Sequence, residues 1–157
     1  EGKGTTVTLR LPLTIAIIEG FAFGVNDQTY VVPLDAVLEC MELDSAPTDT
    51  EHGVLNLRGE PVPYVRLREA LALAGAPPRR ESVVVVKSGE RRAGFVVDVL
   101  HGHSPTVVKP MGKLLNRLPG VSGTAIEGNG RVSLVLDVPH LMNTAARRAA
   151  KLAATAP

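Results

Sequence analysis

Apolar and polar residues alternate over short stretches of this chain, and glycine or proline stands between most of them. Residues 7–11 alternate, which predicts a half-buried strand, and the four valines at 83–86 predict a strand covered on both faces. Further extended segments are expected at 13–18, 21–25, 30–32, 38–41, 53–57, 62–67, 93–99, 106–109, 123–127 and 132–136. Many short strands joined by tight turns are typical of an all-β, mainly antiparallel domain.

Turn signals separate these strands. They are Asn26-Asp27, Arg58-Gly59, Ser88-Gly89-Glu90 and, strongest of all, Asn129-Gly130. Helices are expected to be few: a single turn at 34–37, a short helix at 67–73 and a final helix capped by Asp137. The basic, Ala-rich tail after Ala145 either extends that last helix or frays. Loops are expected at 44–52 and, irregular or briefly helical, at 110–120.

The two halves of the chain resemble each other weakly. Each has its own hairpins and one short helix, and a Pro- and Gly-rich connector at 75–80 lies between them. Chance similarity between hairpins explains this weak resemblance equally well. The spacing contains no βαβ unit, so a parallel sheet is not expected. Two small antiparallel barrels, each closing its own edges, are therefore predicted.

Composition narrows the function classes. The 157 residues include 17 Lys and Arg against 16 Asp and Glu, so the net charge of +1 provides no field for nucleic acid or an anionic membrane. Aromatic residues make up 3% and tryptophan is absent, which disfavours a base-stacking surface. No apolar run approaches the roughly 20 residues of a membrane span, and the first residues do not resemble a signal peptide. A cytoplasmic location is expected.

Candidate catalytic chemistry is sparse. The single cysteine, Cys40, excludes an internal disulfide and is expected to pack as a small apolar residue. His101 and His103 resemble a metal or proton-transfer pair, but they lack a recognised ligand spacing and are assigned to a solvated loop. Asp98 and Asp137 could act as a general acid and base, although a turn or helix-cap acceptor explains each of them better. The sequence therefore predicts no catalytic residue and no metal site.

A resemblance to a known protein family adds further expectations about fold and function. Residues 2–14 resemble the end of the ATP-binding domain of the chemotaxis histidine kinase CheA, where a G-x-G-[ST] box precedes a last strand ending in L-P-L-T. Gly2, Gly4 and Thr5 match that box. The rest of the chain resembles the CheW-like regulatory domain of the same kinase. The matching segments are 30–34, 57–63, 92–98, 107–110, 120–123 and 130–138.

The resemblance implies two intertwined, SH3-like five-stranded barrels. Residues 1–18 would be the terminal strand of the ATP-binding domain and the interdomain joint, 19–144 the regulatory domain with a break near 75–82, and 145–157 a tail. The implied partners are the adaptor CheW, the cytoplasmic tips of chemoreceptors in membrane-associated arrays, and the kinase's own ATP-binding domain. No cofactor is implied for this chain, since ATP serves the parent kinase, and no enzymatic activity is expected of it.

The partner surface is expected at one hairpin. Its candidate residues are Leu57, Arg58, Gly59, Glu60, Val62 and Tyr64. The alternative is a hairpin packed wholly inside its own barrel. Departures from the family pattern at 101–105 and 123–130 are expected to alter partner preference. A free-standing CheW-type adaptor, or in another class a small β-barrel ligand-binding protein, stays open as an alternative function.

Overall fold

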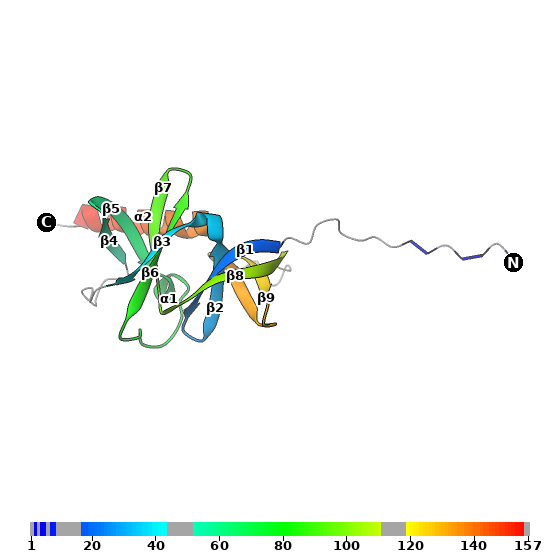
Figure 1. Cartoon of the computed structure of the whole chain (residues 1–157). Helices are drawn as coiled ribbons and strands as arrows, with labels where there is room; N and C mark the ends of the chain where they lie inside the picture. The colour runs from blue at the N-terminus through cyan, green and yellow to red at the C-terminus, as the bar shows by residue number, and fades with distance from the viewer. Residues whose placement is uncertain are drawn as a thin grey trace.

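A computed structural model describes residues 17–43, 52–110 and 119–155, together with residues 2, 4–5 and 7–8. Within this part of the chain, strands dominate (Figure 1). The strands are β1 (Ile17–Val25), β2 (Gln28–Pro33), β3 (Val37–Leu43), β4 (His52–Leu57), β5 (Glu60–Arg66), β6 (Glu81–Ser88), β7 (Arg91–Val97), β8 (Val99–Pro110), β9 (Val121–Glu127) and β10 (Val132–Leu136). The helices are the 3₁₀ turn η1 (Leu34–Ala36), α1 (Leu67–Ala70) and α2 (Val138–Thr155).

The first unit is a closed barrel with the strand order β1-β2-β10-β9-β8. Its interior is narrow and is filled by small side chains such as Ala22, Ala125 and Ser133. A Cβ added at Gly20 would lie 2.6 Å from Val31 Cγ1 and 3.0 Å from the Ser104 carbonyl oxygen. Glycine is therefore required there because a larger residue would push the barrel wall apart.

The second unit is a five-stranded sheet with the order β3-β6-β7-β5-β4. Its own core is lined by Leu55, Leu57, Val62, Tyr64, Val83, Val85 and Val96. The consecutive valines of β6 are buried on both faces of the strand, as the sequence predicted. One face contributes to this core and the other to the core that the two units share.

Most strand pairs are antiparallel, as the sequence predicted, but two pairs are parallel and were not expected. β5 pairs with β7 through Tyr64 and Gly94, and β2 pairs with β10 through Tyr30 and Leu134. The interpretation looked for a helical crossover between adjacent strands. Here the crossover from β5 to β7 contains α1, a connector and the strand β6 itself, whereas β2 and β10 are separated by the whole second unit.

The units are not consecutive halves of the chain. Strands β3 to β7 form the second unit, and they are inserted between β2 and β8 of the first. The connector near 75–82 joins α1 to β6 inside the second unit, so it does not mark a boundary between barrels. Proline and glycine identified a connector correctly, but composition carries no information on which sheets flank it.

The largest core lies between the two units. It combines Phe23 and Val32 of the first unit with Phe95 and Val84 of the second, all fully buried. Helix α2 leaves the first unit after β10 and packs across β4, β5, β6 and β7 of the second (Figure 1). It adds its own buried residues Leu141, Met142 and Ala145 to the shared core. The two units are therefore held together by apolar burial and by a helical strap.

The start of α2 confirms the predicted cap. The Asp137 carboxylate accepts a hydrogen bond from the His140 N–H at 2.9 Å, which satisfies one free donor of the first helical turn. The helix continues to Thr155, so the Ala-rich tail extends it as far as the described residues reach.

Strand β8 covers His101 to Pro105, which corrects the loop assigned there. Val7 and Thr8 lie in no strand, and the rest of the strand expected at 7–11 falls outside the described residues.

Candidate partner-binding surfaces

The β4–β5 turn of the second unit is a hairpin tip of two residues, Arg58 and Gly59. Arg58 and Gly59 both have positive φ, at 53° and 90°. The Asn56 side-chain oxygen accepts a hydrogen bond of 2.7 Å from the Gly59 N–H and fixes the turn. This geometry confirms the predicted turn, and it presents the Arg58 guanidinium to solvent with 82% of its side chain exposed.

The apolar residues of the predicted site do not reach the surface. Leu57, Val62 and Tyr64 are 4%, 2% and 6% exposed and line the core of the second unit. Arg58, Gly59 and Glu60 are exposed. Strand alternation indicates that Val62 and Tyr64 share a face but does not say that this face points inward. Of the six predicted residues, a partner can therefore touch only Arg58, Gly59 and Glu60, which include no apolar side chain.

Two ion pairs surround a hollow at this tip, which we call the end hollow. It has a volume of about 360 Å³ and is lined by Leu38, Glu39, Leu57, Arg58, Glu60 and Arg92. Arg58 Nη2 lies 2.9 Å from Glu39 Oε2, and Arg92 Nη1 lies 2.5 Å from Glu60 Oε2. Leu38 on β3 is 41% exposed at the rim. The end hollow thus offers one apolar residue framed by four charges.

A second depression, the junction groove, lies where the two units meet. Its volume is about 330 Å³, and it is lined by Cys40, Met41, Glu42, Arg80, Glu81, Ser82, Asp98, Val99 and Leu100. Val99 and Leu100 at the start of β8 are 47% and 36% exposed. Burial, aided by the charge of Glu39, raises the pKa of the Cys40 thiol, so the thiol stays protonated near neutral pH.

The sequence interpretation missed the junction groove. Its walls come from three segments that are separated by about 40 and 20 residues along the chain, so no local motif marks it. The sequence pattern predicts that Val99 continues one strand with residues 93–97, and it assigns no role to Leu100. In the structure Asp98 interrupts that strand, and the pair begins a new strand in the other unit.

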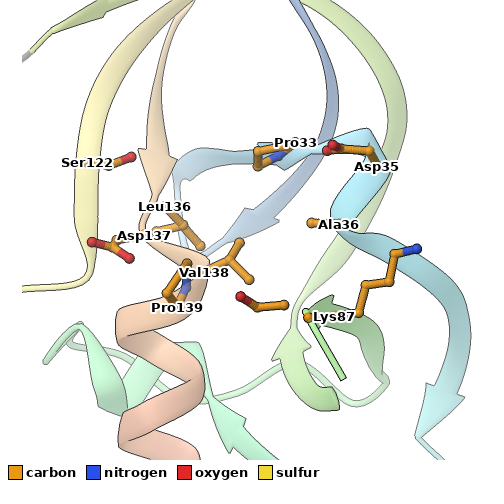
Figure 2. Close-up of a pocket in the computed structure, with 11 residues that line it drawn as sticks. Pro33, Asp35, Ala36, Lys87, Ser122, Leu136, Asp137, Val138 and Pro139 are labelled. Atoms are coloured by element: carbon orange, nitrogen blue, oxygen red, sulfur yellow. The ribbon is translucent and has the colours of Figure 1, made fainter. Parts of the chain in front are cut away.

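A third hollow, of about 660 Å³, lies on another side of the junction (Figure 2). Figure 2 shows Asp35 and Lys87 facing Ser122 and Asp137 across Val138 and Pro139 at the start of α2. Asp137 is engaged in capping α2. No strongly exposed large apolar residue of the described chain lines this hollow, so it lacks the anchor points of the other two.

The remaining candidates do not converge on a reactive site. Gly2, Gly4 and Thr5 are exposed and lie in no helix or strand. His103 Nε2 on β8 contacts the Glu19 carboxylate on β1, and both side chains are exposed. Asp98 accepts hydrogen bonds, as the acceptor interpretation predicted. Among the described residues, no group of three or more His, Cys, Asp or Glu side chains could hold a metal ion. The helices described here include none with the length and hydropathy of a membrane span.

Comparison with known proteins identifies the fold family. The family model described as "CheW-like domain" matches residues 19–146. The chain belongs to the CheW-like domain family. The solved structures agree with this assignment. The chain is similar to the crystal structure of the scaffolding protein TtCheW from Thermoanaerobacter tengcongensis, with a TM-score of 0.68. The matched region covers 80% of this chain and 92% of the TtCheW chain. Sequence identity to TtCheW is 18%, so this match supports the fold alone.

Curated relatives of this CheW-like domain are chemotaxis kinases. The chain is 37% identical over 145 residues to the chemotaxis protein CheA of Klebsiella aerogenes, and 34% identical over 148 residues to the sensor histidine kinase CheAY of Helicobacter pylori. These matches cover 89% and 92% of this chain but only 22% and 18% of the relatives. The CheA of Bacillus subtilis is 31% identical, and this match covers 90% of this chain and 22% of that relative. The chain therefore corresponds to the CheW-like part of such proteins.

Proposed function

We propose that this chain is the regulatory and scaffolding module of a chemotaxis sensor kinase. In this role it binds the adaptor CheW and chemoreceptor tips, and it couples receptor state to kinase autophosphorylation at membrane-associated arrays in the cytoplasm. The observation that carries the proposal is the match of about nine-tenths of the chain to CheA proteins at 30–37% identity. Against a free-standing adaptor, the CheW structure in the comparison is only 18% identical.

The end hollow is the proposed adaptor surface. Interface energy is commonly concentrated in a few residues with an apolar anchor inside a polar rim. Leu38 supplies the anchor, and the Arg58–Glu39 and Arg92–Glu60 pairs supply the rim. Arg58, Arg92 and Glu60 are 82%, 47% and 65% exposed and Glu39 is 28% exposed, so the pairs contribute little to folding and are free to exchange partners in a complex.

The junction groove is the proposed receptor surface. Val99 and Leu100 place exposed apolar area beside the groove charges Glu42 and Arg80. A partner segment with one apolar and one polar face fits such a groove. The groove is walled by both units, so a receptor bound there touches the two parts of the module at once.

Catalysis is assigned to other parts of the parent kinase. Gly2, Gly4 and Thr5 are the only residues that match a nucleotide box, and we propose that they serve ATP binding only together with the kinase's ATP-binding domain, through the joint at 12–19. The competing ligand-binding function requires a saturable small-molecule site. A binding screen with metal ions and nucleotides separates the two functions.

Reversing the charge at the hairpin tip is expected to weaken adaptor binding. Arg58→Glu removes one of the two cations of the rim and places a second carboxylate beside Glu39, and Leu38→Asp removes the apolar anchor. Each change should raise the Kd for purified adaptor at least about tenfold, or about 1.4 kcal/mol, in isothermal titration calorimetry. Thermal unfolding should change little because both side chains are exposed.

Matched controls lie on the first unit. Arg131→Glu reverses an exposed charge and Val132→Asp replaces a 61% exposed apolar residue, both away from the end hollow. These controls should bind adaptor with unchanged affinity. Equal affinity for the Arg58→Glu and Leu38→Asp variants and the unaltered chain would remove the end hollow from the interface.

A further inference from the structure

Two segments, the β1–β2 turn and α1, meet at the carboxylate of Asp98, which lies between β7 of the second unit and β8 of the first. Its Oδ2 accepts a hydrogen bond of 2.6 Å from the Asn26 N–H in the β1–β2 turn, and it also forms an ion pair with the Arg68 guanidinium on α1. The Asp98 N–H donates to the Gly24 carbonyl at 3.0 Å. Arg68 Nη1 donates to the Ala74 carbonyl at 3.3 Å. One charge pair thus links both units.

A neighbouring arginine provides a contrast. Arg66 Nη2 lies 3.1 Å from Glu81 Oε2, and both residues belong to the second unit. Burial alone would lower the pKa of Arg66, but the hydrogen bond and the charge of Glu81 outweigh it, so that the pKa is raised. Arg66 and Arg68 are buried alike, at 7% and 8% exposure. They differ in what they connect. Arg66 braces one unit, whereas Arg68 pairs with Asp98, the link residue that is also hydrogen-bonded to Asn26 and Gly24 of the first unit.

The shared apolar core does not by itself fix the angle between the units. Apolar burial is non-directional, and packed elements can slide by about 1–2 Å without losing it. A guanidinium and a carboxylate impose a direction, because the hydrogen bonds of the guanidinium lie in one plane. The Arg68–Asp98 pair is therefore a directional contact between the units, and the hydrogen bonds of Asp98 to Asn26 and Gly24 extend it to the first unit.

The backbone next to α1 is strained. Ala72, just after α1, has a φ of 53°, which lies in the left-handed region that alanine rarely adopts. Arg68 Nε is buried and has no hydrogen-bond partner among the described residues. Strained backbone and incompletely paired buried groups are found where a structure changes between two arrangements.

We propose that the Arg68–Asp98 pair locks the angle between the two units, and that occupancy of the junction groove acts on this lock. Asp98 lines the groove and directly precedes Val99 and Leu100, so a partner that pulls on these residues moves the carboxylate. This regulatory step rests on the receptor site of the proposed function. The lock itself is a property of the chain alone and can be measured without a partner.

The lock is tested by measuring the distance between the units. Nitroxide labels at Gly128→Cys in the first unit and Glu90→Cys in the second, in a Cys40→Ala background, report this distance by double electron–electron resonance. Both label positions are exposed, and an added Cβ at Gly128 meets nothing within 4 Å. Arg68→Met should shift the mean distance by about 1–2 Å or broaden the distribution. Arg66→Met should lower the melting temperature and leave the distribution unchanged.

An unchanged distribution in Arg68→Met, or the same change in both variants, would overturn the lock. If Arg68→Met does not fold, Asp98→Asn replaces it, because this variant keeps an oxygen for the Asn26 N–H but loses the charge. It should shift the distribution in the same direction, and no shift would equally overturn the lock.

Adding a purified receptor-tip fragment to the labelled, otherwise unaltered chain tests the coupling. A shift in the same direction as that caused by Arg68→Met supports it, and binding without a shift overturns it. If the fragment does not bind at all, the coupling and the proposed receptor site fail together, while the first two variants still decide the lock.

Discussion

Phe95→Ala is expected to lower the free energy of unfolding by about 3–5 kcal/mol, and to do so in both units at once. Phe95 belongs to β7 of the second unit, but it is fully buried in the core shared with β1, β2 and α2. Removing the ring leaves a cavity against both units. Because the second unit is also inserted within the first, neither is expected to unfold alone.

The two tyrosines allow this to be measured. Tyr30 lies in the first unit and Tyr64 in the second, both are buried, and the chain has no tryptophan. Single-tyrosine variants, Tyr64→Phe and Tyr30→Phe, report each unit separately by fluorescence during denaturation. Both probes should show one transition with the same midpoint, displaced equally by Phe95→Ala, whereas Phe95→Leu should displace it less. Displacement of the Tyr64 signal alone would show that the units are independent.

Val62→Asp is expected to cost more than about 3 kcal/mol, because a charge would be buried without a partner. Val62 is 2% exposed and lies among Leu55, Leu57 and Tyr64. The matched control is Val54→Asp on the adjacent strand β4, where the side chain is 57% exposed and the change should stay within about 0.5 kcal/mol. Urea denaturation followed by circular dichroism measures both. A stable Val62→Asp protein that fails to bind adaptor would instead return Val62 to the partner surface.

Local chemistry predicted much of the secondary structure. Alternation and β-branched runs located most of the described strands, Gly59 indicated the hairpin turn, and Asp137 marked the start of the last helix. The family and the all-β fold of two five-stranded sheets followed from short matching segments. Strand β8 was underestimated because Gly102, Ser104 and Pro105 are turn residues that here lie in a strand, next to a register shift against β1.

Long-range pairing could not be predicted in the same way. The parallel contacts of β5 with β7 and of β2 with β10 depend on the insertion of one unit into the other, which no local pattern encodes. The partner surfaces could not be predicted from the sequence either. A period-2 pattern placed Val62 and Tyr64 on one face but did not say which face meets the core. The junction groove and the Arg68–Asp98 pair exist only once both units are assembled.

The central claim is that one module holds two different partners at two separate surfaces. Sedimentation velocity of the chain with purified adaptor and a receptor-tip fragment tests it most directly. We predict a complex that contains all three components. Arg58→Glu should lose only the adaptor and Leu100→Asp only the receptor fragment. Exclusion of one partner by the other, or loss of both partners in either variant, would contradict the account.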